Sequence, residues 1–317
     1  MHLLAAPDKF RGTLTARQAA ASIAAGAARS GWTAVELPLA DGGEGTLEVL
    51  GGGNRRTTVT GPLGDPVEAA WRLEEDGTAL VEAALASGLS LAGGPGGNDP
   101  LRATSRGVGE LVAAAAAQGA GRIVVAVGGV ASTDGGQGAV EALPADLPPL
   151  DVACDVEARF LDAADVFASQ KGATPEQVRI LRERLANLAV PDLPGSGAAG
   201  GLAGGLAARG ARLVPGFEFV ADRLGLDERL AEADLVVTGE GRLDATSFTG
   251  KVVGRMLARA AAAGVEALVL AGDVAAGSPI DAISLVERYG PERALSEPAE
   301  CLVELVATAL AVRRNGP

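Results

Sequence analysis

Four short segments of the chain combine glycine with residues that can bind or transfer charge. They are 41–46 (DGGEGT), 128–136 (GGVASTDGG), 195–201 (GSGAAGG) and 238–244 (TGEGRLD). Glycine lets backbone N–H groups approach an anion closely, and a carboxylate beside such a turn can hold a divalent cation or accept a proton. Because three of the four segments pair glycine with a carboxylate, the set predicts a site for a phosphorylated ligand and its metal.

The scarcity of histidine and cysteine narrows the chemistry further. His2 is the only histidine, which excludes Ser-His-Asp and Cys-His catalysis and zinc sites built from histidine. The two cysteines, Cys154 and Cys301, are too few for a disulfide framework and are interpreted as buried small hydrophobic residues. A general base must therefore be Asp, Glu or Lys, and a metal must be a hard cation bound through oxygen.

The composition is that of a globular protein with an acidic surface. The chain has 317 residues, of which 48% are hydrophobic and 21% charged, enough for one large or two medium α/β domains. Its net charge of −13 argues against nucleic-acid binding, which needs a basic surface. We expect no signal peptide and no transmembrane segment, and hence a soluble cytoplasmic protein.

Strand and helix patterns alternate at both ends of the chain. We expect short buried strands at 2–7, 33–39, 234–238, 267–271 and 282–286. Helices are expected from the N-cap Thr15 to about residue 29, at 251–263 and at 298–314. This β-α rhythm favours a doubly wound parallel sheet built from both chain ends.

The middle of the chain has a different pattern. Residues 54–84 contain three strand-like pieces separated by turn sequences, which predicts an antiparallel meander. Helices at about 106–118 and 175–187 and strands at 122–127 and 151–155 follow. These patterns predict an inserted second α/β domain at 61–224, with residues 1–60 and 225–317 forming the first domain.

Charged residues follow three of the expected strands, where ligands bind in open parallel sheets. They are Asp8, Lys9 and Arg11 after the first strand, Asp41 and Glu44 after the second, and Glu240, Arg242 and Asp244 after the strand at 234–238. The basic residues could clamp carboxylate or phosphate oxygens, and the acids could hold Mg²⁺ or deprotonate a hydroxyl. Each of these residues alone could instead be a solvated loop residue or a helix cap. That alternative is weaker for the whole set, because all of them are expected at one edge of the sheet.

Two familiar nucleotide motifs do not account for the glycines. Residues 195–200 match G-x-G-x-x-G, but the preceding Pro191-Asp192-Leu193-Pro194 cannot be an interior strand, so a dinucleotide site is not favoured. A Walker A sequence is absent, since Gly250-Lys251 is followed by valine. Ser105 is a helix N-cap or an anion contact, and Asp155 and Lys171 are each either structural or part of the site.

Several blocks in the same order resemble the bacterial glycerate kinase family of the two-domain α/β type. They are APDKFRG at 6–12, ADGGEGT at 40–46, ATSRG at 103–107, GG…DGG at 128–136, CDV at 154–156, QKGA at 170–173, GAAGG at 197–201 and ADL…TGEGRLD at 233–244. The resemblance runs over nearly the whole chain. It implies a flavodoxin-like domain carrying a second α/β domain, with the site in the cleft between them.

The resemblance implies ATP-dependent phosphorylation of D-glycerate, with ATP and magnesium (Mg²⁺) as cofactors and 2-phosphoglycerate favoured over 3-phosphoglycerate. In this interpretation Lys9 and Arg11 hold the substrate carboxylate or a phosphate, and Asp41 is the favoured base. The remaining assignments form two groups. Asp244 joins the catalytic set and Glu44, Asp155 and Glu240 are the candidate metal ligands, while Asp8, Gly42, Gly43, Ser105, Gly128, Gly129, Ser132, Asp134, Gly135, Gly136, Lys171 and Arg242 are expected to contact substrate or phosphate.

The chain departs from the family pattern at three places. Segment 157–164 is shortened and lacks glycine, Val130 and Thr133 replace the usual residues of the 128–136 loop, and Thr246 stands where glutamine is usual. A kinase for another small hydroxy acid and a non-catalytic ligand-binding homologue are therefore kept as alternatives. The sequence leaves open whether the protein forms a homodimer.

Overall fold

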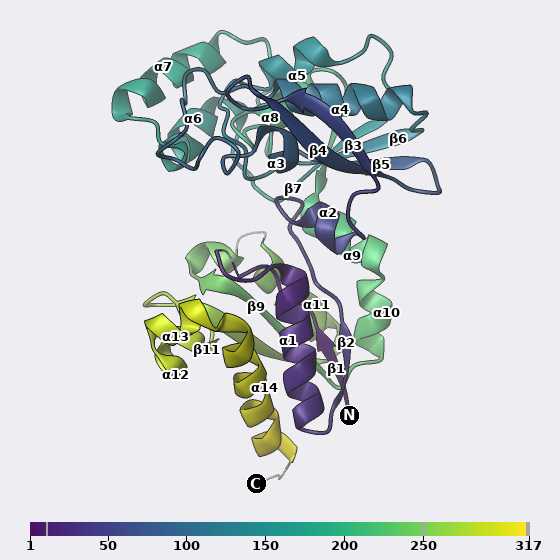
Figure 1. Cartoon of the computed structure of the whole chain (residues 1–317), viewed down its shortest axis with the longest axis vertical. Helices are drawn as coiled ribbons and strands as arrows, with labels where there is room; N and C mark the ends of the chain where they lie inside the picture. Colours follow the sequence, from purple (N-terminus) through teal and green to yellow (C-terminus); the bar gives the residue numbers. More distant parts are fainter. Residues whose placement is uncertain (11, 249–250, 315–317) are drawn as a thin grey trace. The chain divides into compact units, whose positions relative to one another are not determined.

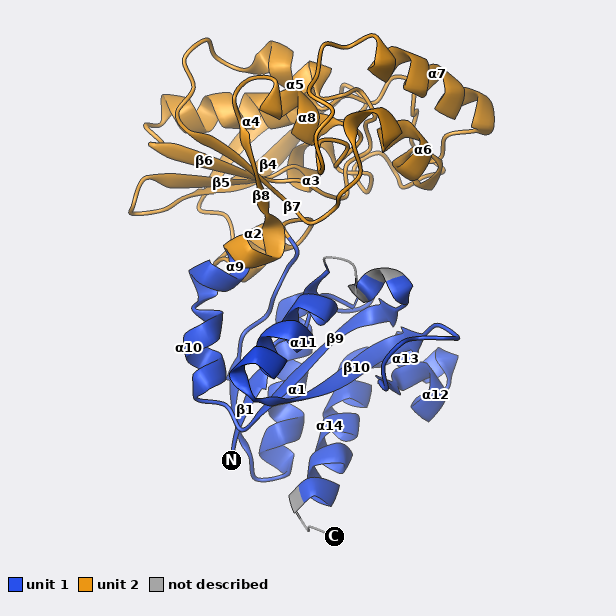
Figure 2. Cartoon of the chain, turned by 180° about the vertical axis from the view of Figure 1, so that it is seen from behind, with its two compact units in different colours: residues 1–41, 220–317 blue, residues 42–219 orange. Residues whose placement is uncertain are grey.

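The computed structural model describes residues 1–10, 12–248 and 251–314, which form two compact units. Unit 1 comprises residues 1–41 and 220–317 and unit 2 comprises residues 42–219, shown in blue and orange in Figure 2. The predicted boundaries, after residue 60 and before residue 225, differ from these. The larger difference has a direct cause, because residues 55–60 form a strand that pairs with the next strand of unit 2.

Unit 1 contains a five-stranded parallel sheet in the order β11-β10-β9-β1-β2. The strands are β1 (His2–Ala5), β2 (Thr33–Glu36), β9 (Leu235–Leu243), β10 (Glu266–Val274) and β11 (Ile283–Ser284). Numbered within the unit, this is the order 2-1-3-4-5 of flavodoxin-like folds, in which ligands bind where the chain switches direction between the first and third strands. The predicted doubly wound fold class is confirmed.

Helices cover both faces of this sheet (Figure 1). One face packs on α1 (Ala16–Arg29), α12 (Leu285–Tyr289), α13 (Pro291–Ser296) and α14 (Pro298–Arg314), and the other on α11 (Val252–Ala263), with α10 (Leu226–Ala231) beside α11. The division follows from the alternation of side chains along β10, where Leu270 belongs to the first core and Val269 and Ala271 to the second. A parallel sheet buried in this way needs apolar residues on both faces.

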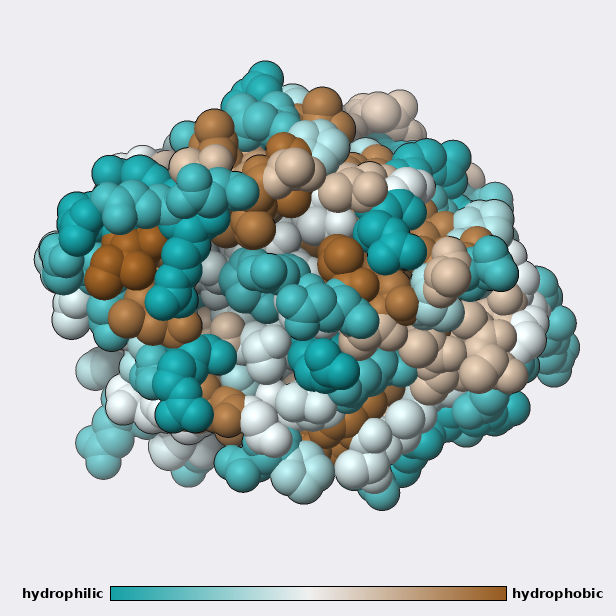
Figure 3. Space-filling view, turned by 90° about the horizontal axis from the view of Figure 1, so that it is seen from above, coloured by the Kyte–Doolittle hydropathy of each residue, from teal (hydrophilic) through white to brown (hydrophobic). Residues whose placement is uncertain are grey.

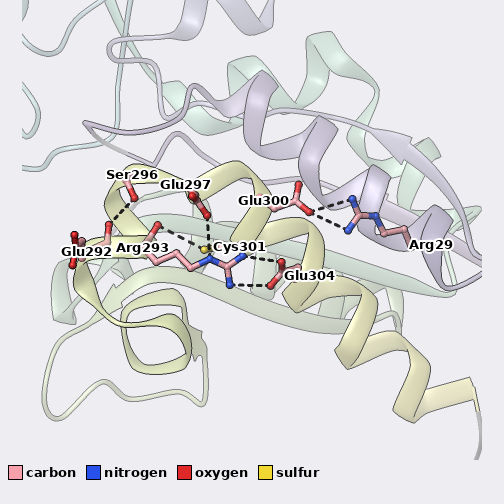
Figure 4. A network of polar contacts seen from close by, with 8 residues as sticks. All are labelled: Arg29, Glu292, Arg293, Ser296, Glu297, Glu300, Cys301 and Glu304. Carbon is pink, nitrogen blue, oxygen red and sulfur yellow. Dashed lines mark hydrogen bonds and ion pairs between the residues drawn. The ribbon is translucent and has the colours of Figure 1, made fainter.

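The helix ends are fixed by the side chains that the sequence predicts. Thr15 caps α1 through a capping box with Gln18, as expected from the Thr15 signal. Figure 4 shows how α13 and α14 are joined: Arg293 donates to Glu304 at 2.8 and 3.1 Å and to Glu297 at 3.1 Å. These exposed ion pairs contribute little individually, so apolar packing of α14 on α1 carries most of the stability.

Unit 2 contains a six-stranded mixed sheet in the order β3-β4-β5-β6-β7-β8. The strands are β3 (Arg55–Thr60), β4 (Pro66–Leu73), β5 (Thr78–Glu82), β6 (Arg122–Ala126), β7 (Leu150–Cys154) and β8 (Arg212–Pro215). The first three form the predicted antiparallel meander, and the last four run parallel. β8 was not predicted, because four residues ending in proline carry little strand signal on their own.

The helices of unit 2 form the main core against one face of the sheet and a smaller core beside it. They are α2 (Thr46–Val49), α3 (Ala84–Ser87), α4 (Arg106–Ala117), α5 (Gln137–Ala142), α6 (Ala163–Phe167), α7 (Pro175–Ala186) and α8 (Leu202–Ala207), while α9 (Gly216–Leu224) continues from unit 2 into unit 1. The G-x-G-x-x-G segment forms turns before α8 with no strand ahead of it, which agrees with the rejected dinucleotide interpretation.

The surface does not separate into one apolar and one polar side in the view of Figure 3. Apolar residues lie there in several small patches between hydrophilic ones. Scattered apolar side chains are ordinary at protein surfaces and carry no argument about a partner. None of the helices in the described part of the chain combines the length and apolar composition needed to cross a bilayer.

A buried aspartate, paired with two exposed arginines, joins three neighbouring strands of unit 2. Asp151 of β7 is 3% exposed and accepts hydrogen bonds from Arg122 of β6, at 2.7 Å, and from Arg212 of β8, at 2.8 Å. Burial opposes the charge of Asp151, but the hydrogen bonds and charges of Arg212 and Arg122 outweigh it and hold the pKa below its usual value. The two arginines thus link both neighbours of β7 to one carboxylate.

We expect Asp151→Asn to lower the free energy of unfolding of unit 2 by about 1–3 kcal/mol at pH 7. A group with a lowered pKa stabilises the fold above its unfolded pKa and loses that contribution as the pH falls through the folded pKa. The difference between variant and wild type should therefore shrink in acid. Urea unfolding at pH 7 and pH 3 measures it, with exposed Asp146→Asn as the control. An equal difference at both pH values would contradict the ion-pair explanation.

Candidate active site

Three carboxylates meet at the carboxyl-terminal edge of the unit 1 sheet. Asp8 follows β1 and its N–H donates to Gly239 O of β9 at 2.9 Å. β1 lies between β2 and β9, so Asp8 lies between Asp41, which follows β2, and Glu240 of β9. Asp41 and Glu240 both raise the pKa of Asp8 through their charges. The predicted convergence of these strand ends is therefore present within unit 1, at the switch point of the sheet.

Asp8 is held in an environment that favours its protonated form. It is 9% exposed, and burial together with the charge of Asp41 raises its pKa to about 7, although Lys9 and a 2.7 Å hydrogen bond from the Lys9 N–H oppose this. The charge of Glu240 adds to the increase. A carboxylate with a pKa near neutrality is suited to exchange a proton at physiological pH.

Glu240 carries an unsatisfied acceptor in the same group. Burial raises its pKa, against a hydrogen bond from Ser247 and the charge of Lys251, and Asp244 and Asp41 raise it further. Within the described residues, the buried Oε1 of Glu240 has no hydrogen-bond partner. Buried carboxylate oxygens are normally hydrogen-bonded, so this atom points to a proton donor or cation that binds there. Ser247, which also accepts from the Asp244 N–H at 3.0 Å, was not predicted.

The carboxylates of Asp8, Asp41 and Glu240 offer only part of the oxygen ligands that a hard cation such as Mg²⁺ needs. No cluster of three or more His, Cys, Asp or Glu side chains ready to hold a metal occurs in the described part of the chain. Mg²⁺ in phosphoryl-transfer sites is commonly held by one or two carboxylates together with substrate phosphates and water, so a complete protein cage is not required. The unpartnered Glu240 Oε1 and the neighbouring Asp41 meet that smaller requirement.

Asp155, predicted as a metal ligand, has another role. It follows β7 and accepts hydrogen bonds from the N–H groups of Gly216 at 2.9 Å and Phe217 at 2.6 Å. These are the first N–H groups of α9, which helices leave without an internal partner. Asp155 therefore holds the start of α9, and its predicted role as a metal ligand stays a prediction. Glu44 belongs to unit 2 and Glu240 to unit 1, so the predicted ligand set is not brought together within either unit.

The 42–46 loop lies on the carboxyl-terminal edge of the unit 2 sheet, where it meets the 128–129 loop. A Cβ on Gly128 would lie 2.8 Å from Gly43 Cα, and one on Gly129 would lie 3.4 Å from Glu44 Oε2. Backbone contact this close admits only glycine at position 128. The two glycine loops are thus joined, and packing alone accounts for glycine at position 128.

Glu82 fixes the 42–46 loop and was missed by the sequence reasoning. It ends β5, is 3% exposed, and accepts hydrogen bonds from the N–H groups of Gly45 at 3.0 Å and Leu47 at 2.9 Å. The available signal was a lone acidic residue at the end of an otherwise apolar strand, Ala79-Leu80-Val81-Glu82. Glu82 thereby positions the loop that carries Glu44.

We expect Glu82→Gln to destabilise unit 2 by about 1–3 kcal/mol, because glutamine offers one acceptor oxygen to two N–H groups and turns its NH₂ towards one of them. Urea unfolding gives the stability, and Glu75→Gln, an exposed position in the same hairpin, is the control. An unchanged unfolding midpoint would show that the loop does not depend on these two hydrogen bonds.

The predicted phosphate contacts at 134–136 and Ser105 take part in hydrogen bonds within unit 2. Asp134 accepts from Ser105 N and Oγ, both at 2.8 Å, and from the N–H groups of Gly136 at 3.1 Å and Gly138 at 3.2 Å. The Gly135 N–H donates to Gly200 O at 3.1 Å. Both glycine N–H groups thus have protein acceptors in this conformation, and a phosphate contact at these residues stays a prediction.

The remaining predicted residues are distributed as follows. Lys171 is buried and Ser132 is fully buried beside it, whereas Arg242 is exposed on β9. Gly42 has a φ of +82°, and a Cβ there would lie 2.7 Å from Gly216 Cα, so it is a point of close approach. Arg11 lies outside the described residues.

Comparison with known proteins assigns the family. The model of the glycerate kinase family matches residues 3–149 and 146–307. The two matched segments overlap at residues 146–149, in the loop before β7. An uncharacterized protein of Mycobacterium bovis is 41% identical over 354 aligned residues, covering 100% of this chain and 93% of the relative. Since this chain has 317 residues, that relative contains segments that it lacks.

Relatives that carry a functional name, and one solved structure, support the same family assignment. The glycerate 2-kinase of Escherichia coli is 38% identical, covering 80% of this chain and 80% of the relative. The glycerate kinase of Halalkalibacterium halodurans is 34% identical, covering 98% of this chain and 97% of the relative. The crystal structure of a candidate glycerate kinase 2 from Salmonella typhimurium superposes with a TM-score of 0.79 at 34% identity, covering 100% of this chain and 99% of that one. The chain belongs to the glycerate kinase family.

Proposed function

We propose that this protein transfers the γ-phosphoryl group of ATP to D-glycerate and releases 2-phosphoglycerate and ADP. Family membership supports the phosphorylation of glycerate. The site of transfer is proposed to be the carboxylate group of unit 1. The observation that supports it best is the buried Glu240 Oε1 near Asp41 and Asp8, which has no hydrogen-bond partner among the described residues. The 2-phospho product is proposed because the Escherichia coli relative is named glycerate 2-kinase.

The proposed reaction needs alignment, charge neutralisation and one proton acceptor. A substrate hydroxyl oxygen bonds to the γ-phosphorus, the bond from phosphorus to the β,γ-bridging oxygen breaks, and the hydroxyl proton passes to a carboxylate. Asp41 is the acceptor favoured by the sequence, but the raised pKa of Asp8, to about 7, makes Asp8 the better matched base. While no cation is bound, the charge of Asp41 helps to keep Asp8 basic.

Mg²⁺ would supply charge neutralisation at the phosphate oxygens, and Glu240 and Asp41 are the side chains proposed to hold it. Lys9 and Arg11 are proposed to contact the transferring phosphate. Arg242 and Asp244 follow Glu240 in sequence and are proposed to complete the charge distribution around it.

A coupled assay of ADP release, with ATP, Mg²⁺ and a panel of small hydroxy acids, tests this proposal. We expect turnover with D-glycerate, and phosphorus NMR of the product should show a phosphate ester at the 2-hydroxyl. Turnover with a different acid would select the alternative suggested by the divergent 157–164 segment. Ligand binding without any turnover would select a non-catalytic homologue.

A further inference from the structure

Glu240, the central carboxylate of the proposed cation site, is held by a buried hydroxyl. Ser247 lies in the short 3-10 helix η3 (Ala245–Phe248), and its side chain is fully buried. Its hydroxyl hydrogen-bonds to the Glu240 carboxylate. Because Oε1 of Glu240 has no hydrogen-bond partner among the described residues, this bond falls on the other oxygen, Oε2. The serine thus occupies one oxygen of Glu240 and leaves the second for a ligand.

A backbone N–H group fixes the direction of the Ser247 hydroxyl. The Asp244 N–H donates to Ser247 Oγ at 3.0 Å, so the serine oxygen is an acceptor there and its proton is left for Glu240. A hydroxyl that accepts one hydrogen bond becomes a stronger donor for the next, because the two bonds polarise each other. The N–H, the hydroxyl and the carboxylate therefore form a directed chain that begins on the backbone after β9 and ends on Glu240.

The charges around Glu240 show why its carboxylate needs to be held. Asp244 and Asp41 repel it, whereas Lys251 attracts it. Lys251 is the N-cap residue of α11, where the helix dipole adds positive potential. A carboxylate that is free to rotate in such a field turns towards the cation. The hydrogen bond from Ser247 opposes that rotation and keeps Glu240 within the group of acids.

Resting on the proposed function, we propose that Ser247 is a positioning residue of the transfer site, which holds Glu240 so that Oε1 is left for the divalent cation. Ser247 itself contacts neither the cation nor the substrate. The arrangement lies within unit 1, because Glu240 belongs to β9 and both Asp244 and Ser247 belong to the turn that follows it. Loss of a hydrogen bond that orients a metal-binding side chain typically weakens metal binding by about 10- to 100-fold.

Closing the turn after β9 is the structural alternative for Ser247. The Ser247 N–H donates to Asp244 O at 3.0 Å, so the backbone closes this turn without the help of the side chain. Removing the hydroxyl leaves that backbone bond in place, and we expect the turn to persist. The hydroxyl can therefore be tested separately from the turn that carries it.

Mn²⁺ binding to the full chain without nucleotide tests the proposal, because Mn²⁺ prefers the same oxygen ligands as Mg²⁺ and electron paramagnetic resonance measures the unbound ion. We expect Ser247→Ala to weaken binding at the Glu240 site about 10-fold, and Ser247→Thr, which keeps the hydroxyl, to restore it. Glu240→Gln defines the loss of that site, so that cations held elsewhere on this acidic chain can be subtracted. Ser22→Ala is the matched control, because Ser22 is a buried serine of α1 whose hydroxyl donates to Gln18 O at 2.9 Å.

Turnover provides a second measurement that a merely structural serine would not pass. Ser247→Ala should raise the Mg²⁺ concentration needed for half-maximal turnover about 10-fold and leave KM for the hydroxy acid unchanged. Adding Ser247→Ala to Glu240→Gln should lower turnover little further, because a positioning residue acts through the residue that it holds. A serine with a structural role would instead lower turnover by the same factor in both backgrounds.

The outcomes separate this role from the proposed reaction. A wild type that binds Mn²⁺ at Glu240 but turns over no hydroxy acid would reject the reaction, while the binding data still decide the role of Ser247. An unchanged Mn²⁺ affinity in folded Ser247→Ala would reject the role, and so would a Glu240→Gln variant that loses no Mn²⁺ site. Failure of Ser247→Ala to fold would reject it as well, because the hydroxyl would then be needed for the fold.

Discussion

The Glu240→Gln variant should lose turnover by a factor of about 10²–10³ and still unfold at a temperature no lower than the wild type. Glutamine keeps the shape of the side chain and an oxygen for the Ser247 hydrogen bond. It removes one negative charge from a group of carboxylates in which Asp41 and Asp244 raise the pKa of Glu240, and Asp41 and Glu240 raise the pKa of Asp8. Loss of function with equal or greater stability is what distinguishes a functional cluster from a structural one.

Coupled turnover and thermal unfolding of the same preparation measure both parts of this prediction. Asp41→Asn should behave in the same way, and Glu232→Gln, an exposed position at the end of α10, should change neither quantity. Nearly normal turnover in Glu240→Gln would remove Glu240 from the site. A large decrease in unfolding temperature would assign it a structural role.

The contribution of Asp8 to stability should fall as the pH rises from about 4 to about 7, and Asp8→Asn should remove that contribution. The native state holds a proton on Asp8 up to a pKa of about 7, against an ordinary value of 3.8, so the folded chain binds more protons than the unfolded chain between these values. Linkage then makes the unfolding free energy decrease with increasing pH, by about 2–4 kcal/mol over the full interval.

Urea unfolding at pH 4.5, 6 and 7.5 checks this, with exposed Asp222→Asn as the matched control in unit 1. The difference between Asp8→Asn and wild type should favour the variant increasingly as the pH rises. If the two proteins show parallel pH profiles, Asp8 ionises normally in the folded state, and its proposed role as the base loses its support.

The sequence predicted local structure well where the signal is local. Thr15 caps α1 as predicted, and the helix expected at 175–187 begins at Pro175. The turn sequences at Gly61–Pro66 and Asp76–Gly77 separate the three strands of the meander. β8 was missed because its stability comes from pairing with β7, which lies some sixty residues earlier in the chain. Pairing partners that distant leave little trace in a short window of sequence.

The candidate site was predicted by position but only partly by role. The carboxyl ends of β1, β2 and β9 carry Asp8, Asp41 and Glu240 as expected, because strand-end placement follows from the parallel pattern. The roles of Asp134 and Asp155 were not predictable. Both accept backbone N–H groups that become neighbours only when the loops fold, and a carboxylate that caps a loop has the same sequence signature as one that binds a metal.

The order of the strands along the chain also sets the order in which the protein can fold. β1 pairs with β9, and the His2 N–H donates to Asp234 Oδ2 at 2.8 Å across 232 residues of sequence. Unit 2 is one continuous segment, so it can fold during synthesis before β9 has left the ribosome. Until then β1 lacks its β9 neighbour and leaves one edge unpaired, so the nascent amino-terminal segment is open to non-native strand pairing.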